Sequence, residues 1–327
     1  MSSPASILRH ELMLRARAWA AGRSHAESYS TNPVVVFAPD GGRHGNFLDS
    51  SYDAICKNPR WFRRFNKVHA QGRSLPRPED PARRWRELDS SMSSDALLMN
   101  IFCSPEVTAF AQVRALLGVS ANASAPEFGV RAQVPFVSGR FDRTEVDLSW
   151  GDLLAEAKLT EANFQTARPD LVLNYRDLNE VFDVDRLPQV ELPAERQRTA
   201  AEFPEDSSQE EVRVSPEEWT PTADLPARAT TPGFASYQLI RNVLAAHALG
   251  KRFAVLLDER RPDLLEAWFR VLAVVRTAEL RTRLAVLTWQ ELTAVLPEEL
   301  QRFLDAKYGI VPPGYRASPV VGMPVME

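Results

Sequence analysis

The segment from 143 to 161, RTEVDLSWGDLLAEAKLTE, constrains the fold of this chain more than any other part of the sequence. Apolar and polar residues alternate on both sides of Gly151-Asp152, as they do in strands that bury one face. Glycine at the first position of a two-residue turn is typical of a tight hairpin. The segment therefore predicts two adjacent antiparallel strands.

The length of the turn also predicts which residues lie opposite each other. With a two-residue turn, Asp147 faces Glu156 and Glu145 faces Lys158. Because side chains alternate along a strand, one face of the hairpin is apolar and the other is polar. The apolar face carries Val146, Leu148, Trp150, Leu153, Ala155, Ala157 and Leu159, and the polar face carries Glu145, Asp147, Ser149, Leu154, Glu156 and Lys158.

The polar face suggests a metal site. Two carboxylates directly opposite each other destabilise a hairpin by up to about 1 kcal/mol. A divalent cation between Asp147 and Glu156 would turn this repulsion into binding, and Mg²⁺ prefers such hard oxygen ligands. The alternative interpretation is a solvated face on which Glu145 and Lys158 form a surface ion pair while Asp147 points at water.

The composition of the chain bears on the role of Lys158. The chain has 5 lysines and 34 arginines, so a residue needed only to pair with Glu145 would more often be arginine. Lysine is a compact point charge that can approach a phosphate or a water molecule. The rarity of lysine therefore favours a chemical role for Lys158.

Overall composition is that of an ordinary globular protein, with 44% hydrophobic and 25% charged residues among 327. This length predicts one large domain with extensions, or two domains. No run approaches the roughly 18 apolar residues of a membrane span, and charge interrupts the N-terminal residues too often for a secretory signal. We therefore expect a cytoplasmic protein with no membrane partner. Two distant cysteines predict neither a disulfide scaffold nor a structural zinc site.

Two segments depart strongly from the net charge of -4. Residues 57–86 are basic and interleaved with aromatic residues, which indicates either a phosphate-contacting surface or a solvated helix whose aromatic side chains pack inward. Residues 177–232 are acidic, rich in proline and serine, and lack a sustained apolar period. This second segment predicts an irregular insertion that either shields a basic groove or is simply solvated.

The remaining patterns predict the order of helices and strands. Helices are expected at 6–21, 89–102, 105–118 and 236–250, and strands at 32–37, 128–136 and 252–257. A helix, a strand and one or two helices follow up to 309, so a mixed sheet covered by helices is expected. We predict a helical and basic N-terminal extension at 1–88, a main domain at 89–310 and a flexible tail at 311–327.

The helix that follows the acidic insertion carries a polar cluster. Gln238, Arg241 and Asn242 are three and four residues apart, so they share one face of the helix. The helix is otherwise apolar, and burial of this cluster therefore requires polar partners. Its start also offers free N–H groups that suit a phosphate. In the structural alternative, Arg241 pairs with a carboxylate and Gln238 bonds a loop carbonyl.

A strand aspartate, an E-x-K sequence on the next strand, and a YQLIRN helix followed by a buried strand resemble the PD-(D/E)xK nuclease superfamily. The sequence is most similar to its bacterial restriction-endonuclease-like group with a YQLxRN helix, and the resemblance covers residues 89–309. The proline of the signature is replaced by Val146. Two sets of positions match, the catalytic set Asp147, Glu156 and Lys158 and the helix set Gln238, Arg241 and Asn242.

The resemblance implies an α/β fold, with a restriction-endonuclease-like mixed central sheet flanked by helices. It also implies that Asp147, Glu156 and the carbonyl of Ala157 hold Mg²⁺, with Mn²⁺ as an alternative. Lys158 would orient or deprotonate the attacking water and stabilise the developing charge. The remaining site positions would steady the site and touch the DNA backbone, namely Gln238, Arg241 and Asn242, with Glu161 and Tyr237 in supporting contacts.

The function that the resemblance implies is metal-dependent hydrolysis of DNA phosphodiester bonds. A further acidic ligand is expected from Glu87, Asp95 or Glu127. Two alternatives remain open, a catalytically inactive nucleic-acid-binding or protein-interaction module of the same fold, and an unrelated enzyme that acts on another phosphate ester. No glycine-rich phosphate loop, nucleophile elbow or HExxH sequence supports the second. The sequence also allows a homodimer.

Overall fold

A five-stranded mixed sheet lies at the centre of the computed structural model, which describes residues 3–28, 33–68, 75–78, 84–193 and 230–319. The strand order is β14-β13-β9-β8-β5. The strands are β5 (Glu127–Arg131), β8 (Glu145–Trp150), β9 (Leu153–Ala157), β13 (Arg252–Leu257) and β14 (Leu284–Thr288). Strand β13 is parallel to both neighbours, whereas β8 is antiparallel to β5 and β9. The predicted mixed central sheet is confirmed.

The hairpin of β8 and β9 has the predicted register. Leu148 pairs with Ala155, and Trp150 pairs with Leu153. Gly151 has a φ of +61°, the left-handed conformation that glycine adopts without steric cost at the first position of such a turn. The turn length therefore specified the pairing correctly, but the predicted face of Val146 is wrong, because Val146 packs with Leu154 in a different hydrophobic core from Leu148.

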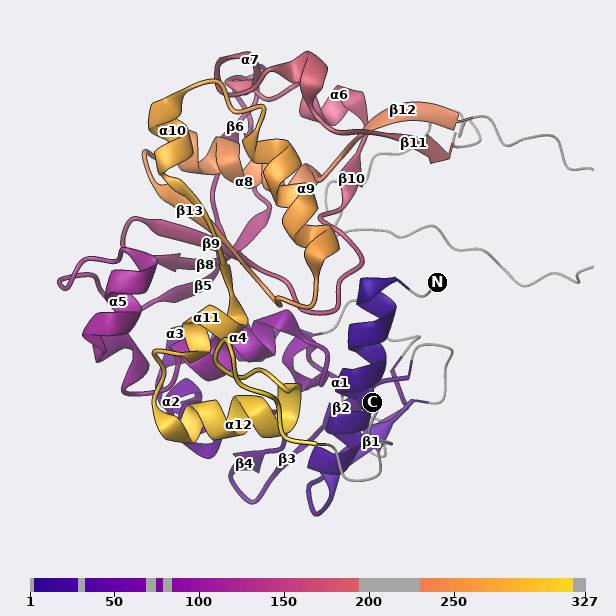
Figure 1. Cartoon of the computed structure of the whole chain (residues 1–327), viewed down its shortest axis with the longest axis vertical. Coiled ribbons are helices and arrows are strands. Elements are labelled where there is room, and N and C mark those ends of the chain that lie inside the picture. The colour runs from indigo at the N-terminus through magenta and orange to yellow at the C-terminus, as the bar shows by residue number, and fades with distance from the viewer. Residues whose placement is uncertain (1–2, 29–32, 69–74, 79–83, 194–229, 320–327) are drawn as a thin grey trace, which may run out of the picture.

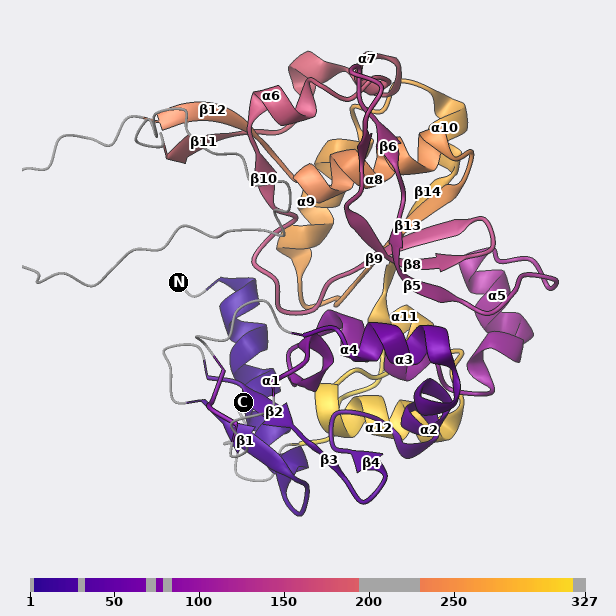
Figure 2. The ribbon, with the colours of Figure 1, turned by 180° about the vertical axis from the view of Figure 1, so that it is seen from behind.

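Helices cover both faces of the central sheet (Figures 1 and 2). On one side lie α8 (Tyr237–Ala248), α9 (Pro262–Leu272) and α10 (Ala278–Thr282), and on the other lie α1 (Pro4–Ala20), α4 (Ser94–Phe102), α11 (Trp289–Thr293) and α12 (Glu298–Tyr308). Each side has its own hydrophobic core, and Leu154 of the hairpin's polar face packs into the core that contains α8. The expectation of a solvated polar face is therefore wrong, because this face also lies beneath a helix.

The N-terminal residues share a core with the rest of the chain. Leu8 and Leu12 of α1 belong to the same hydrophobic cluster as Leu148 of β8 and Leu300 of α12. The core thus runs across position 88, where the sequence predicts the end of an extension. The other N-terminal elements are β1 (His25–Glu27), β2 (Val35–Phe37), β3 (Pro39–Asp40), β4 (Arg43–His44), α2 (Asp49–Lys57), α3 (Pro59–Phe65) and the 3-10 helix η1 (Glu87–Asp89).

The flanks of the acidic insertion are regular. Helix α7 (Leu178–Val181) and the 3-10 helix η3 (Val184–Arg186) precede strand β11 (Gln189–Pro193). In a separate three-stranded sheet, β12 (Thr230–Ala235) pairs with β11 and with β10 (Thr166–Ala167). The expected irregular segment at 177–232 is therefore ordered at both ends, and neither end joins the central sheet. Its remainder, 194–229, lies outside the described residues.

The beginning of the predicted C-terminal tail is anchored. The backbone N–H of Ser318 donates to Asp305 over 2.8 Å, and Arg15 donates to the Ser318 carbonyl over 3.1 Å. Residues 320–327 lie outside the described part of the chain. The elements not yet named are η2 (Val107–Ala109), α5 (Ala111–Leu117), β6 (Val134–Pro135), β7 (Phe141–Asp142) and α6 (Pro169–Val172).

Candidate active site

The two predicted metal-binding carboxylates lie on adjacent central strands. Asp147 is on β8 and Glu156 is on β9, and the Ala157 N–H donates to Asp147 Oδ2 over 2.8 Å. Burial raises the pKa of Asp147 well above its ordinary value, and the nearby carboxylates of Glu156 and Asp95 raise it further. The hairpin therefore concentrates negative charge in a partly desolvated place.

Lys158 neutralises part of this charge. Its ammonium lies 2.8 Å from Glu156 Oε1, and the two residues are only 5% and 2% exposed. Burial lowers the pKa of Lys158, but the carboxylates of Glu156, Glu161 and Asp147 outweigh burial and raise it above its ordinary value. Lys158 is therefore an ammonium at neutral pH. The alternative in which it pairs with Glu145 on the surface is wrong, because Glu145 binds Arg64 and Lys67 instead.

Helix α8 presents its polar cluster to these carboxylates, as the spacing predicts. Asn242 Nδ2 donates to Glu156 Oε2 over 2.8 Å. Arg241 donates from Nε and Nη2 to Asn242 Oδ1 over 3.1 and 3.0 Å, and from Nη2 to the Glu145 carbonyl over 3.1 Å. Within the described residues Arg241 has no carboxylate partner, so this part of the structural alternative is wrong. Asn242, itself bonded by Arg241, instead holds the Glu156 carboxylate from helix α8.

Gln238 has an unused acceptor in the same region. Its side-chain Oε1 is buried and lacks a hydrogen-bond partner. The expected free N–H groups are absent from this turn, because those of Tyr237 and Gln238 donate to the carbonyls of Gln165 and Phe164 over 3.1 and 3.0 Å. The prediction of a phosphate site at the start of α8 is therefore wrong for these two backbone groups.

Glu161 and Tyr237, the two predicted supporting residues, bind different parts of the chain. Glu161 accepts hydrogen bonds from Ser94 Oγ over 2.6 Å and from the Leu159 N–H over 2.7 Å. The Tyr237 hydroxyl lies 3.1 Å from Asp142 Oδ2 and 2.8 Å from the Tyr175 hydroxyl. Asp142 and Tyr175 were missed by sequence reasoning, because they are 95 and 62 positions from Tyr237 and nothing local marks the contact. Asp142 and Tyr175 together hold the first turn of α8 through the Tyr237 hydroxyl.

The structure separates the three candidates for a further acidic ligand. Glu127 pairs with Arg60, and Glu87 lies near Arg64 and Lys67. Asp95, at the start of α4, is the candidate whose charge raises the pKa of Asp147. Burial raises the pKa of Asp95 itself, although Arg64 and Lys67 oppose this effect. Asp95 is therefore the acidic residue that the fold brings to the site.

The described part of the basic segment 57–86 supports the interpretation in which aromatic side chains pack inward, whereas the phosphate-contacting surface stays a prediction. Phe65 is fully buried, and Trp85 is mostly buried, as expected for aromatic side chains that pack inward. Arg60 and Arg63 on α3 are exposed to solvent. Arg64 is mostly buried and binds Asp95 and Glu145. The segment thus contributes to the site through a mostly buried cation, which no sequence pattern indicated.

The donor set of two neighbouring carboxylates is compatible with Mg²⁺. Among the described residues, no group of three or more His, Cys, Asp and Glu side chains is arranged to hold a metal ion. Mg²⁺ is usually held by one or two carboxylates and keeps waters or substrate phosphates as its other ligands. The crowded carboxylates of Asp147 and Glu156 meet that requirement, because a cation would relieve their repulsion.

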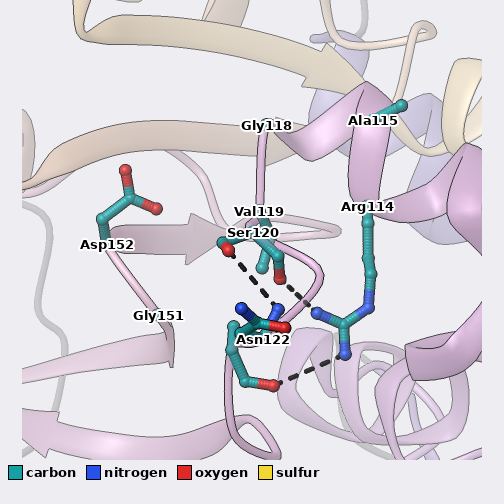
Figure 3. A pocket seen from close by; sticks show the side chains of 9 residues that line it. Arg114, Ala115, Gly118, Val119, Ser120, Asn122, Gly151 and Asp152 are labelled. Atoms are coloured by element: carbon teal, nitrogen blue, oxygen red, sulfur yellow. Dashed lines mark hydrogen bonds between the residues drawn. The ribbon is translucent and has the colours of Figure 1, made fainter.

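A hollow of about 450 Å³ lies at the turn of the hairpin, away from the carboxylates. It is lined by Gly151 and Asp152 and by the loop after α5 (Figure 3). Arg114 donates from Nε to the Thr108 carbonyl over 2.6 Å and lies 5.0 Å from the centre of the Trp150 ring. Figure 3 shows its guanidinium directed at the loop that contains Ser120. These contacts hold the loop after α5, and none of the predicted site residues lines the hollow.

The sequence matches the family described as Restriction Endonuclease associating with ARP over residues 15–309. No curated protein and no solved structure matches it. The match covers most of the chain, including the last part of α1 and all of α3, and agrees with the restriction-endonuclease-like fold class. No helix among the described residues has both the length and the apolar character needed to cross a membrane.

Proposed function

The chain belongs to the family of restriction endonucleases associating with ARP, and we propose that it is a metal-dependent nuclease of the PD-(D/E)xK type that hydrolyses DNA phosphodiester bonds. One observation carries the proposal. Glu156 and Lys158 are buried and bonded to each other, the half-buried Asp147 completes the cluster through its electrostatic effect on both, and Asn242 of the YQLIRN helix binds Glu156. A structural ion pair would need one carboxylate for one lysine. Here the two carboxylates of Asp147 and Glu156 lie near the single ammonium of Lys158.

In the proposed reaction, Asp147, Glu156 and the Ala157 carbonyl hold Mg²⁺ or Mn²⁺. The bound ion would polarise the phosphate and acidify a water molecule. Asn242 keeps Glu156 oriented, and it is held in turn by Arg241. Preorganised polar groups of this kind cost no rearrangement when charge develops in the transition state.

Lys158 acts in this proposal as a fixed positive charge. Its raised pKa opposes a role as the proton acceptor, because an ammonium has no free electron pair. The ammonium would orient the attacking water and stabilise negative charge on the phosphate. Its short hydrogen bond to Glu156 keeps it beside the carboxylates where the reaction would occur.

The remaining motif residues have supporting roles. Gln238 offers a buried, unused carbonyl oxygen that can accept a hydrogen bond from a bound water. Glu161 fixes the end of β9 to α4, and Tyr237 fixes the start of α8. Arg241 and Asn242 are buried, so the half-buried Gln238 is the member of this set that could contact the DNA backbone, and such a contact would give affinity without sequence information.

The proposal is tested by incubating the purified protein with plasmid, linear and single-stranded DNA in the presence of Mg²⁺, Mn²⁺ or EDTA. We expect cleavage with either metal and none with EDTA. Arg270→Gln is a matched control, because this residue forms an exposed ion pair with Glu266. Cleavage by the control variant should equal that of the wild type.

Other outcomes would identify the two alternatives. Binding of DNA without cleavage under every metal condition would favour an inactive module of the same fold. Neither binding nor cleavage of DNA, together with hydrolysis of a small phosphate ester, would favour an unrelated enzyme. Cleavage that persists in EDTA would contradict the metal requirement.

A further inference from the structure

Arg64 is a mostly buried cation beside the candidate metal site. It lies on α3, and its side chain is 9% exposed. Nη1 is 3.1 Å from Glu145 Oε2, and Nη2 donates to Asp95 Oδ2. Glu145 is two residues before Asp147 on β8, and Asp95 is the acidic residue of α4 that acts electrostatically on Asp147. The Arg64 guanidinium therefore joins β8, which carries Asp147, to α4, which carries Asp95.

The charge on Arg64 is strongly retained. Burial lowers its pKa, but the carboxylates of Asp95, Glu87, Asp147 and Glu145 outweigh burial and raise it. Arg64 Nε is buried and has no hydrogen-bond partner. The guanidinium therefore pairs with the neighbouring carboxylates although one of its buried N–H donors stays unused. A side chain needed only for packing would not require a guanidinium between the carboxylates of Asp95 and Glu145.

We propose that Arg64 is a built-in cation that compensates the carboxylates of the site when metal is absent, and that it thereby sets the affinity of the site for Mg²⁺. The proposal rests on the proposed metal-dependent function. Arg64 and the metal act on the same negative charge. Arg64 therefore lowers the affinity of the site for Mg²⁺, and bound Mg²⁺ lowers the stabilisation that Arg64 gives. Such a coupling is reciprocal by thermodynamic necessity.

Two other cations of the basic segment, Lys67 and Arg60, do not duplicate this role. Lys67 reaches Glu145 over 3.0 Å, but it is 42% exposed, so solvent and salt screen its charge. Arg60, one turn before Arg64, is 77% exposed and pairs with Glu127. Arg60 is therefore a matched control, since it has the same helix and residue type but lies outside the site.

The test compares Arg64→Gln, Arg64→Lys and Arg60→Gln with the wild type. Mg²⁺ binding is measured by calorimetry, and melting temperature is measured with EDTA and with Mg²⁺. We expect Arg64→Gln to melt lower in EDTA, to bind Mg²⁺ about fivefold or more tightly, and to gain more stability from it. Arg64→Lys keeps the charge, so its affinity for Mg²⁺ should stay near that of the wild type, as should that of Arg60→Gln.

Equal Mg²⁺ affinity in the wild type and Arg64→Gln would overturn the proposal. Equal changes in Arg64→Gln and Arg64→Lys would also overturn it, because the fork geometry rather than the charge would then matter. A wild-type protein that binds neither Mg²⁺ nor Mn²⁺ would instead refute the metal requirement of the proposed function. The two failures are therefore distinguishable.

A second pair of variants covers the case in which Arg64→Gln does not fold because Asp95 is left unpaired. Asp95→Asn and the double variant Asp95→Asn/Arg64→Gln leave no buried carboxylate at position 95. We expect the double variant to bind Mg²⁺ about fivefold or more tightly than Asp95→Asn does. Equal affinities in this pair would contradict the proposal.

Discussion

Two buried lysines have opposite surroundings in this protein. Lys158 is 5% exposed and lies 2.8 Å from the Glu156 carboxylate. Lys307, on α12, is 2% exposed and donates only to neutral oxygens, which are the Asn46 carbonyl at 3.1 Å, Asn46 Oδ1 at 2.6 Å and the Tyr308 hydroxyl at 2.5 Å. Among the described residues, no carboxylate forms an ion pair with it.

The difference shows that burial alone does not decide the charge of a lysine. Burial lowers the pKa of both residues. At Lys158 the nearby carboxylates reverse the effect, whereas at Lys307 burial prevails and the pKa falls well below its ordinary value, with Arg23 adding to the fall. The carboxylates near Lys158 therefore keep an ammonium where the proposed reaction needs one.

The largest effect is expected when Lys158 is given surroundings like those of Lys307. Glu156→Gln removes its carboxylate partner and leaves a buried ammonium bonded to neutral groups. We expect the metal-free protein to lose about 3 kcal/mol of unfolding free energy at pH 7, because breaking a buried ion pair costs about 3 to 5 kcal/mol and Glu161 and Asp147 still act on the ammonium. Denaturant unfolding in EDTA measures this loss. A change below about 0.5 kcal/mol would show that the pair is not stabilising.

The second prediction keeps the charge at Lys158 and changes its shape. Lys158→Arg places a larger, planar group in a site with almost no exposed surface. We expect the variant to fold and to bind Mg²⁺ and DNA, but to lose cleavage activity by about a hundredfold or more, because the positive charge is misplaced. Cleavage rates in Mg²⁺ check this, with Lys251→Arg as the control. Wild-type rates in Lys158→Arg would rule out the assigned role.

The third prediction uses pH to separate the two lysines. The pKa of Lys307 is lowered in the folded state, so between that pKa and the ordinary value of 10.5 the unfolded state binds one more proton. Stability should therefore rise with pH in this window by up to about 1.4 kcal/mol per pH unit, and Lys307→Met should lack this rise. Unfolding of the variant and of the wild type between pH 7 and pH 10.5 gives the difference.

Lys158 supplies the comparison for that measurement. Its folded pKa is raised, so its contribution is fully present below 10.5 and is lost only as the pH rises through the folded value. The stability difference between the wild type and Lys158→Met should thus stay constant from pH 7 to pH 10. A parallel pH response of the Lys307→Met and Lys158→Met variants would mean that the two lysines do not differ in charge.

The smallest effect is expected at Asp147. Its folded pKa is raised, so its charge costs stability once the pH exceeds the ordinary carboxyl pKa. Asp147→Asn should stabilise the metal-free protein at pH 7 by up to about 1 kcal/mol, because it relieves the repulsion with Glu156. The same variant should lose stabilisation by Mg²⁺ while DNA binding persists. Thermal unfolding with EDTA and with Mg²⁺ tests both parts, and undiminished Mg²⁺ stabilisation would exclude Asp147 as a ligand.

Short-range contacts of the site could be predicted from the sequence. Glu156 lies on β9 and Lys158 is two positions later, one residue past the end of the strand, so extended backbone brings them to the same face. Gln238, Arg241 and Asn242 share a helix face for the same geometric reason, and the turn length specified the pairing of Leu148 with Ala155. These relations depend on backbone periods alone.

Long-range contacts could not be predicted in this way. Glu145 binds Arg64, which is 81 positions away, and the sequence alone equally allowed a pair with Lys158. Glu87, Asp95 and Glu127 were indistinguishable until α4 placed Asp95 beside Asp147. Nothing in the local pattern of α12 showed that Lys307 would be buried against Asn46, which is 261 positions away.

The sequence by itself determined the two strands of the hairpin, their turn, and the shared helix face of Gln238, Arg241 and Asn242, because steric periods of two and 3.6 residues act between near neighbours. Only the tertiary structure decided the depth of burial, the partners of each charge and therefore the pKa of each lysine. The physical reason is that desolvation and electrostatic energies depend on distance through space. Residues far apart along the chain, such as Arg64 and Asp95, acquire these energies when the core brings them together.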